Sequence, residues 1–285
     1  MWLFLALGSA IFAGFVSVLG KRGMANVPSN LATAIRSTVA LLLAWLLVLV
    51  SGAGSELTSL SAGALLAITL SGLATGASWL MYFKALKLGR VAQVVAIDRT
   101  SLLFTGLFAI AFFGETTNLA FKLTGLVLVF VGTLILVWQK GGLRSETLAW
   151  LPWAIGSMGF AVATTLLAKA ALDSVDSTLA TALRTIVVVA VASGIAWSKG
   201  ELKGAGGFGR SGYLLLGLSG LATGASWLCY FGALKLGQVS LVAPVDKLSI
   251  VFAAVLAYLL LGEKVSRRGL VGLAVMVAGT LVLVL

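Results

Sequence analysis

The chain has 285 residues, of which 60% are apolar and only 10% are charged, and its formal net charge at pH 7 is +11. A typical soluble domain carries about 25% charged residues, so this composition excludes that class and indicates an integral membrane protein. Histidine is absent and Cys229 is the single cysteine, which excludes an intrachain disulfide and disfavours haem and zinc sites. The positive charge does not indicate nucleic-acid binding, because Lys and Arg gather in the cytoplasmic loops of membrane proteins.

Ten apolar segments follow one another along the chain, each about the length of a membrane-spanning helix. A helix needs about 20 residues to cross the hydrocarbon core, so ten spans with short connections use the whole chain. Residues 41–50 are apolar throughout, which excludes the alternating pattern of a membrane β-barrel. The first segment has its basic residues after it, so we interpret it as a permanent span and not as a signal peptide. The predicted spans are residues 2–20, 29–50, 63–86, 91–113, 119–138, 150–170, 178–197, 212–235, 239–261 and 267–285.

The sequence contains one unit twice, at an offset of 148 residues. Residues 71–89 and 219–237 are identical at 17 of 19 positions. We therefore divide the chain into two repeats of five spans, residues 1–143 and residues 144–285. The same offset relates polar residues outside that segment: Lys21 to Lys169, Arg36 to Arg184, Asp98 to Asp246, and Gly114-Glu115 to Gly262-Glu263.

Five is an odd number of spans, so the second repeat must enter the membrane from the side opposite to the first. Inverted repeats should carry their basic residues on non-corresponding loops. Thirteen Lys and Arg residues flank the connections between spans 1–2, 3–4, 5–6, 7–8 and 9–10, whereas three flank the others. The three are Lys122, Lys169 and Lys235. This bias predicts a multi-pass protein of the cell's inner membrane with both termini outside the cytoplasm.

The doubled pattern resembles the EamA family of the drug/metabolite transporter superfamily. The resemblance covers nearly all of both halves, and it rests on the Lys that closes span 1, the Arg in span 2 and the Gly-Glu that ends span 4 of each half. It implies an all-α membrane protein of ten transmembrane helices, arranged as two inverted repeats. It also implies export of small metabolites or amino acids through a central cavity by alternating access. Ten-span relatives are usually drawn with both termini in the cytoplasm, which is the reverse of the charge count.

The strings ATAIRS and ATALRT resemble a subgroup whose members are often single five-span units that pair antiparallel. This chain resembles a fused pair of such units, for which a monomer would suffice. The glutamate that small multidrug transporters carry in the middle of span 1 is absent, since residues 10–15 and 161–165 contain no acid. This departure disfavours proton-coupled export of lipophilic cations.

Ionisable side chains inside the spans are the first candidates for a substrate site, because each costs about 2.5–3.5 kcal/mol to insert. Arg36 and Asp98 lie at a similar depth below the same surface, so we expect them to meet, whereas the neighbouring Arg99 should face elsewhere. The second repeat carries the same set as Arg184, Asp246 and Lys247. Two interpretations are open: static ion pairs that join helices, or substrate-lining gates that favour an anionic or zwitterionic molecule.

Aromatic residues in spans 3 and 8 are the second set of candidates. Trp79 and Tyr82, with Trp227 and Tyr230, lie at helical spacing, and they either pack toward lipid or form a wall for the substrate. The glycine pairs of the same helices predict close helix packing. Together these observations predict a substrate-binding set of Arg36, Trp79, Tyr82, Asp98, Arg99, Arg184, Trp227, Tyr230, Asp246 and Lys247.

We make predictions for three further residues, two glutamates at span ends and one proline within a span. Glu115, which ends span 4, and its counterpart Glu263 should be solvated stops at the membrane interface. Pro244, opposite Ala96 in the other repeat, removes a backbone hydrogen bond before Asp246 and could kink span 9 in one half only. That difference is a candidate source of transport direction.

The function predicted from the sequence is secondary transport of a small polar metabolite. The alternative is a flippase or scramblase for a lipid-linked headgroup, which would also use basic side chains in a groove. An enzyme is not expected, because no nucleophile with an activating base and no phosphate-binding loop occurs. The expected partners are the small-molecule substrate and the bilayer; no cofactor is expected, and the sequence does not identify a coupling proton or ion.

Overall fold

In the computed structural model the described residues, 1–23, 27–88, 91–137, 148–201, 209–262 and 265–285, form helices and no strands. The side chains of residues 21, 83, 87, 91–93, 96 and 137 also lie outside this description. The helices are α1 (Trp2–Gly23), α2 (Ser29–Ser51), the short 3₁₀ helix η1 (Ala53–Ser59), α3 (Ala62–Leu88), α4 (Val91–Arg99), α5 (Ser101–Phe113), α6 (Leu119–Val137), α7 (Leu151–Leu172), α8 (Ser177–Ser198), α9 (Arg210–Leu236), α10 (Val239–Asp246), α11 (Ser249–Leu261) and α12 (Arg267–Val284).

The all-α membrane fold predicted from the sequence is confirmed. Nine segments of the described chain are helical, long and apolar enough to cross a membrane, and α10 with α11 counts as one of them. The remaining predicted span, residues 91–113, is also helical but is divided into α4 and α5. Large apolar side chains such as Leu49, Phe112 and Leu259 are exposed on the outside of the bundle, as expected for a surface covered by lipid.

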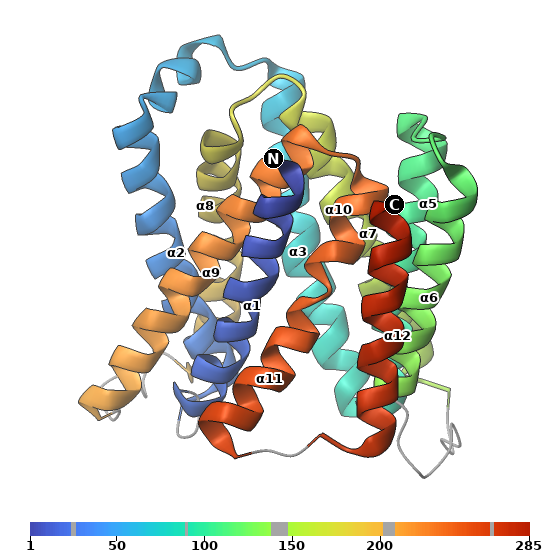
Figure 1. The fold of residues 1–285 in the computed structure, drawn as a ribbon. Coiled ribbons are helices and arrows are strands. Elements are labelled where there is room, and N and C mark those ends of the chain that lie inside the picture. Colours follow the sequence, from blue (N-terminus) through green and yellow to red (C-terminus); the bar gives the residue numbers. More distant parts are fainter. Residues whose placement is uncertain (24–26, 89–90, 138–147, 202–208, 263–264) are drawn as a thin grey trace.

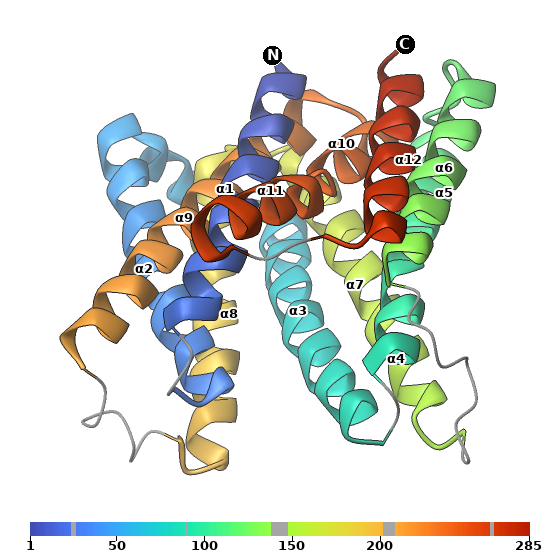
Figure 2. The same ribbon diagram turned by 60° about the horizontal axis from the view of Figure 1, so that its bottom comes forward.

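The two repeats are inverted relative to each other. Figures 1 and 2 show both chain termini at the same end of the molecule; α1 runs away from this end, whereas its counterpart α7 runs toward it. We call this end the terminal face, and we call the end where α6 stops and α7 starts the linker face.

The repeats interdigitate and do not simply lie side by side. Helix α1 packs along α9, and the equivalent pair α3 and α7 packs in the same way. Helices α2 and α8, and likewise α6 and α12, are counterparts that contact each other across the pseudo-twofold axis. A cavity between these helices therefore takes its lining from both repeats.

The repeated glycines bring α3 against α8 and α9 against α2. A Cβ atom on Gly72 would lie 2.7 Å from the Cβ of Val187, and one on Gly220 would lie 2.6 Å from the Cβ of Val39. Both distances are shorter than packed carbon atoms allow, so only glycine permits this approach of the helices. The prediction that these glycines form packing surfaces is confirmed, and the two surfaces are equivalent because residues 39 and 187 are also 148 apart.

Candidate functional site

Two helices are broken inside the membrane, at equivalent places in the two repeats. Only Thr100 separates α4 from α5, and only Lys247 and Leu248 separate α10 from α11. At about 1.5 Å per residue, each break lies roughly 10–15 Å from the start of the short helix before it. The Thr100 N–H donates to the Ile97 carbonyl and the Leu248 N–H donates to the Val245 carbonyl, both at 3.0 Å, so tight turns replace the α-helical pattern. Irregular backbone at this depth is tolerated where it is buried in protein or lines a cavity.

Pro244 does not account for the break in the second repeat. It lies inside α10, where it removes one backbone donor. Its counterpart, Ala96, lies inside α4, and that helix stops at the equivalent place without a proline. Because both repeats break, Pro244 does not give one half a kink that the other half lacks.

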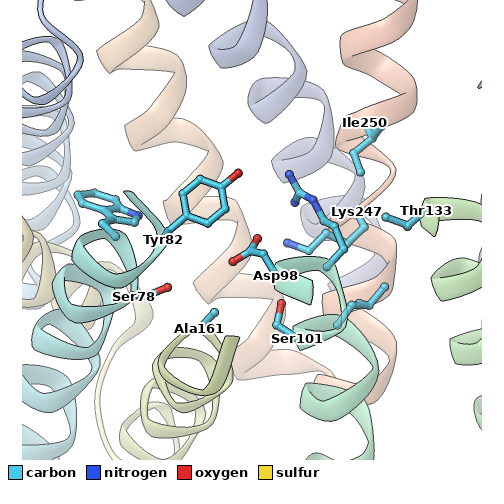
Figure 3. Close-up of a pocket in the computed structure, with 11 residues that line it drawn as sticks. Ser78, Tyr82, Asp98, Ser101, Thr133, Ala161, Lys247 and Ile250 are labelled. Atoms are coloured by element: carbon cyan, nitrogen blue, oxygen red, sulfur yellow. The ribbon is translucent and has the colours of Figure 1, made fainter. Parts of the chain in front are cut away.

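The first break opens into a cavity of about 320 Å³ that is lined by both repeats. Asp98 and Arg99 come from the end of α4, whereas Lys247 comes from the break between α10 and α11. Figure 3 shows the polar ends of Tyr82, Asp98 and Lys247 pointing into the same space. Asp98 and Lys247 thus bring opposite charges from the two repeats into one cavity.

The second break opens into an equivalent cavity of about 300 Å³. Lys247 also lines this cavity, so the two spaces are neighbours. A third cavity, of about 230 Å³, shares Trp79 with the first and Trp227 with the second. Seven lining residues of the second cavity are the counterparts of lining residues in the first: Ala13, Ser226, Trp227, Tyr230, Asp246, Lys247 and Ser249 correspond to Ala161, Ser78, Trp79, Tyr82, Asp98, Arg99 and Ser101.

Each aspartate is held by a serine from the first helix of the other repeat. Ser157 of α7 donates to Asp98 at 3.3 Å, and Ser9 of α1 donates to Asp246 at 2.6 Å. Residues 9 and 157 are 148 apart, so the contacts are equivalent, although the second is much shorter. Lys247 Nζ lies 3.6 Å from the other carboxylate oxygen of Asp246.

A second serine supports each of these contacts from α3 or α9. Ser78 donates to the Ser157 carbonyl at 3.0 Å, and Ser226 donates to the Ser9 carbonyl at 3.1 Å. These hydroxyls therefore bind a neighbouring helix and not their own. The two aspartate sites are built alike, and each combines residues of both repeats.

The expected ion pair between Arg36 and Asp98 is not formed in the described residues. Arg36 instead donates to the Thr223 hydroxyl of α9 at 3.3 Å and lines the third cavity, together with the hydroxyl residues Thr33 and Ser37. Spans 2 and 4 do carry these residues at similar depths, but α9 of the other repeat packs along α2 and supplies the partner. Arg36 is only half-buried.

The expected pair of Arg184 and Asp246 is replaced in the same way, although both residues line the second cavity. Arg184 donates to Ser71 at 3.1 Å and to Thr75 at 2.6 Å, both on α3. Its guanidinium carbon lies 4.9 Å from the centre of the Phe231 ring. Arg184 is only 6% exposed, so the two equivalent arginines lie in different environments.

The expectation that Arg99 faces away from Asp98 was wrong, because both side chains line the first cavity. The helix stops after Arg99, and the 100° rotation between neighbours in a continuous helix no longer applies there.

Of the two interpretations of the aromatic residues, the structure favours the cavity wall. Trp79 and Tyr82 line the first cavity, and Trp227 and Tyr230 line the second.

Ser9 and Ser157 complete the aspartate sites but were not among the predicted site residues. The signal was present, because both are serines in the largely apolar first span of a repeat and are related by the repeat offset. The expectation for Glu115 was also wrong: its side chain is 5% exposed and bonds to backbone of the other repeat. Its counterpart Glu263 lies outside the described residues.

Comparison with known proteins agrees with the doubled architecture. A sequence profile described as the EamA-like transporter family matches residues 1–138 and, separately, residues 148–285. A curated protein of a Sinorhizobium species, named as an uncharacterized transporter in the cobO 3′ region, is 44% identical over 135 residues, which cover 96% of that protein and 47% of this chain. That relative therefore has about the length of one repeat.

A solved protein crystal structure shares the fold across the whole chain. It is 17% identical and has a TM-score of 0.78, over 99% of this chain and 95% of its own. At this identity the likeness concerns the fold alone. With the profile matching both halves, the chain belongs to the EamA-like transporter family.

Proposed function

We propose that this membrane protein is a secondary transporter that exports a small polar metabolite, of the amino-acid class, by alternating access between its inverted repeats. The observation that supports this proposal is the pair of equivalent cavities at the two broken helices, each lined by one aspartate together with Lys247. Discontinuous helices near the middle of the membrane are a recurrent way for transporters to build substrate sites.

The charges of each cavity suit a zwitterion. The first cavity has one acid, Asp98, and two bases, Arg99 and Lys247; the second has Asp246 with Lys247 and Arg184. An ammonium group would bind the aspartate and a carboxylate would bind the bases, so each cavity can neutralise both ends of an amino acid. The Trp and Tyr rings would cover the apolar part of the substrate and, for Tyr82 and Tyr230, offer a hydroxyl.

Arg36 adds an anion site beside these two cavities. Its Nε atom is buried and has no hydrogen-bond partner in the described structure. The 230 Å³ cavity that it lines contains the hydroxyl groups of Thr33, Ser37 and Thr223. A guanidinium among hydroxyl groups suits a carboxylate in transit.

We further propose that the protein lies in the inner membrane with the terminal face outside the cytoplasm. The count of 13 basic residues against three supports this orientation. The three lysines on the side with few basic residues each donate a hydrogen bond to a backbone carbonyl. Lys122 donates to Glu115, Lys169 to Leu234 and Lys235 to Val175, at 2.7 to 2.8 Å. Lysines bound in this way stabilise helix ends and need not follow the loop bias.

The experiment measures efflux of radiolabelled amino acids from proteoliposomes, together with scrambling of a fluorescent lipid in the same vesicles. Asp98→Asn and Asp246→Asn should each abolish efflux while the protein still inserts. Asp173→Asn, at a 68% exposed side chain near the membrane surface, is the matched control and should retain it. Full efflux by both cavity variants would refute the proposed site, and lipid scrambling without efflux would favour a headgroup flippase instead.

A further inference from the structure

Glu115 of the first repeat caps the start of α10 in the second. Its two carboxylate oxygens accept the backbone N–H groups of Val239 and Ser240, at 2.7 and 2.8 Å. Glu115 is 5% exposed, so these bonds are shielded from solvent. A carboxylate at a helix N-terminus satisfies donors that the helix leaves free and opposes the positive end of its dipole.

Lys122 of α6 completes the attachment. Its Nζ donates to the Glu115 carbonyl at 2.7 Å, to the Gln238 side-chain oxygen at 2.5 Å and to the Thr117 hydroxyl at 3.3 Å. Lys122 is only 2% exposed, yet its ammonium has three oxygen partners. A buried ammonium with this many acceptors holds its neighbours firmly, because each of these hydrogen bonds is charge-assisted. We call Glu115 and Lys122 the α10 anchor.

The other end of α10 carries the second aspartate site. The helix has only eight residues, so its ends are about 12 Å apart and a tilt at one end moves the other directly. Asp246 is its last residue and accepts the 2.6 Å bond from Ser9. Helix α10 also packs against α5 of the first repeat.

We infer that Glu115 and Lys122 are positioning residues for substrate binding at Asp246 and Lys247. This inference rests on the proposed transport function. By fixing the start of α10 to the first repeat, the anchor sets the position of the Asp246 carboxylate and of the Lys247 ammonium that lines both cavities.

The residues at the positions equivalent to the anchor differ between the two repeats. The repeat offset places Glu263 opposite Glu115, but it places Leu270 opposite Lys122 and Arg90 opposite Gln238. At the position equivalent to Lys122 the second repeat therefore has an uncharged leucine. This agrees with the aspartate contacts, which measure 2.6 Å at Asp246 and 3.3 Å at the other site.

The test measures amide hydrogen exchange in nanodiscs, which needs no substrate. Glu115→Gln and Lys122→Met should each speed exchange in peptides covering residues 238–248 by about tenfold or more, since each removes charge-assisted bonds. Exchange in residues 91–99 should not change. The matched control is Arg22→Met, which removes a 2.6 Å bond from a basic side chain to the Leu260 carbonyl across the repeats at the linker face. It should leave exchange of residues 238–248 as in the parent protein.

A transport readout separates positioning from simple stabilisation. Lys122→Met should raise KM for amino-acid efflux by about tenfold with a smaller change in maximal rate, and Lys122→Arg should restore most of the affinity. Unchanged exchange in both anchor variants would overturn the inference, and so would faster exchange with an unchanged KM. Absence of efflux from the parent protein would refute the proposed function and with it the positioning role, whereas the exchange result would still report whether the anchor holds α10.

Discussion

Arg36 and Arg184 occupy equivalent positions, but the same substitution should affect them differently. Arg184 is nearly fully buried and donates to two hydroxyl groups, at 3.1 and 2.6 Å, with two aromatic rings beside its guanidinium. Arg36 is half-buried and donates to one hydroxyl group at 3.3 Å. Lysine keeps the charge at either position but loses the planar fork of donors.

The expected magnitudes follow from these contacts. A hydrogen bond to a charged group contributes about 1.5–3 kcal/mol, and a buried cation–π contact contributes up to about 2 kcal/mol. A lysine at position 184 can keep one hydrogen bond and part of the ring contact, so we expect Arg184→Lys to lower the free energy of unfolding by about 2–4 kcal/mol. Arg36→Lys loses at most one long, partly solvated bond, so its cost should stay below about 1 kcal/mol.

The assay is reversible unfolding in mixed micelles of dodecyl maltoside and increasing sodium dodecyl sulfate, followed by circular dichroism. Both variants keep the net charge, so detergent binding to the folded protein should be matched between them. Equal losses would refute the reasoning, because they would mean that the two arginines share the same average environment. A larger loss of unfolding free energy for Arg36→Lys than for Arg184→Lys would mean that Arg36 is the more deeply buried arginine in solution.

Three other predictions concern packing, the aspartate sites and orientation. Gly72→Leu should lower the free energy of unfolding by about 1–3 kcal/mol, because its side chain would overlap Val187. Gly63→Leu should not lower it, because nothing lies within 4 Å of the Cβ position there. Equal effects of the two substitutions would contradict the packing role. Ser9→Ala should reduce efflux more than Ser157→Ala, since the bonds that they remove to the aspartates measure 2.6 and 3.3 Å; the reverse order would argue against the unequal sites. Alkaline phosphatase fused to the C-terminus should be active and green fluorescent protein fused there should be dark, and the opposite pair of results would reverse the proposed orientation.

The fold could be predicted from the sequence because the hydrophobic segments and the repeat are strong local signals. Each span is long enough to cross the bilayer, and an odd number of spans in each repeat requires inversion. The break at Thr100 was not predicted, because no proline precedes it and residues 91–113 are apolar enough to appear continuous. The turn over residues 97–100 contains neither glycine nor proline, the residues that most often mark a tight turn.

The residues of the candidate site could be predicted from the sequence, but the contacts between them could not. Asp98 and Lys247 stand out as charges within apolar spans, yet their shared cavity depends on how the two repeats interlock. The Arg36–Asp98 pair was predicted from the depth of the two residues within one repeat. Depth alone does not determine which helices are neighbours. Glu115 was misread for the same reason: at the end of a span it looks solvated, until α10 of the other repeat covers it.

The two aspartate sites differ although the sequence around them is nearly the same. Ser78 and Ser226 lie in segments that match at 17 of 19 positions, and their bonds to the first helix of the other repeat are almost equal, at 3.0 and 3.1 Å. The difference of 0.7 Å at the aspartates therefore accompanies other differences between the repeats. Lys122, whose counterpart is Leu270, is such a difference, and it acts on the helix that carries Asp246. If transport exchanges the conformations of the repeats, its two end states should then have unequal free energies.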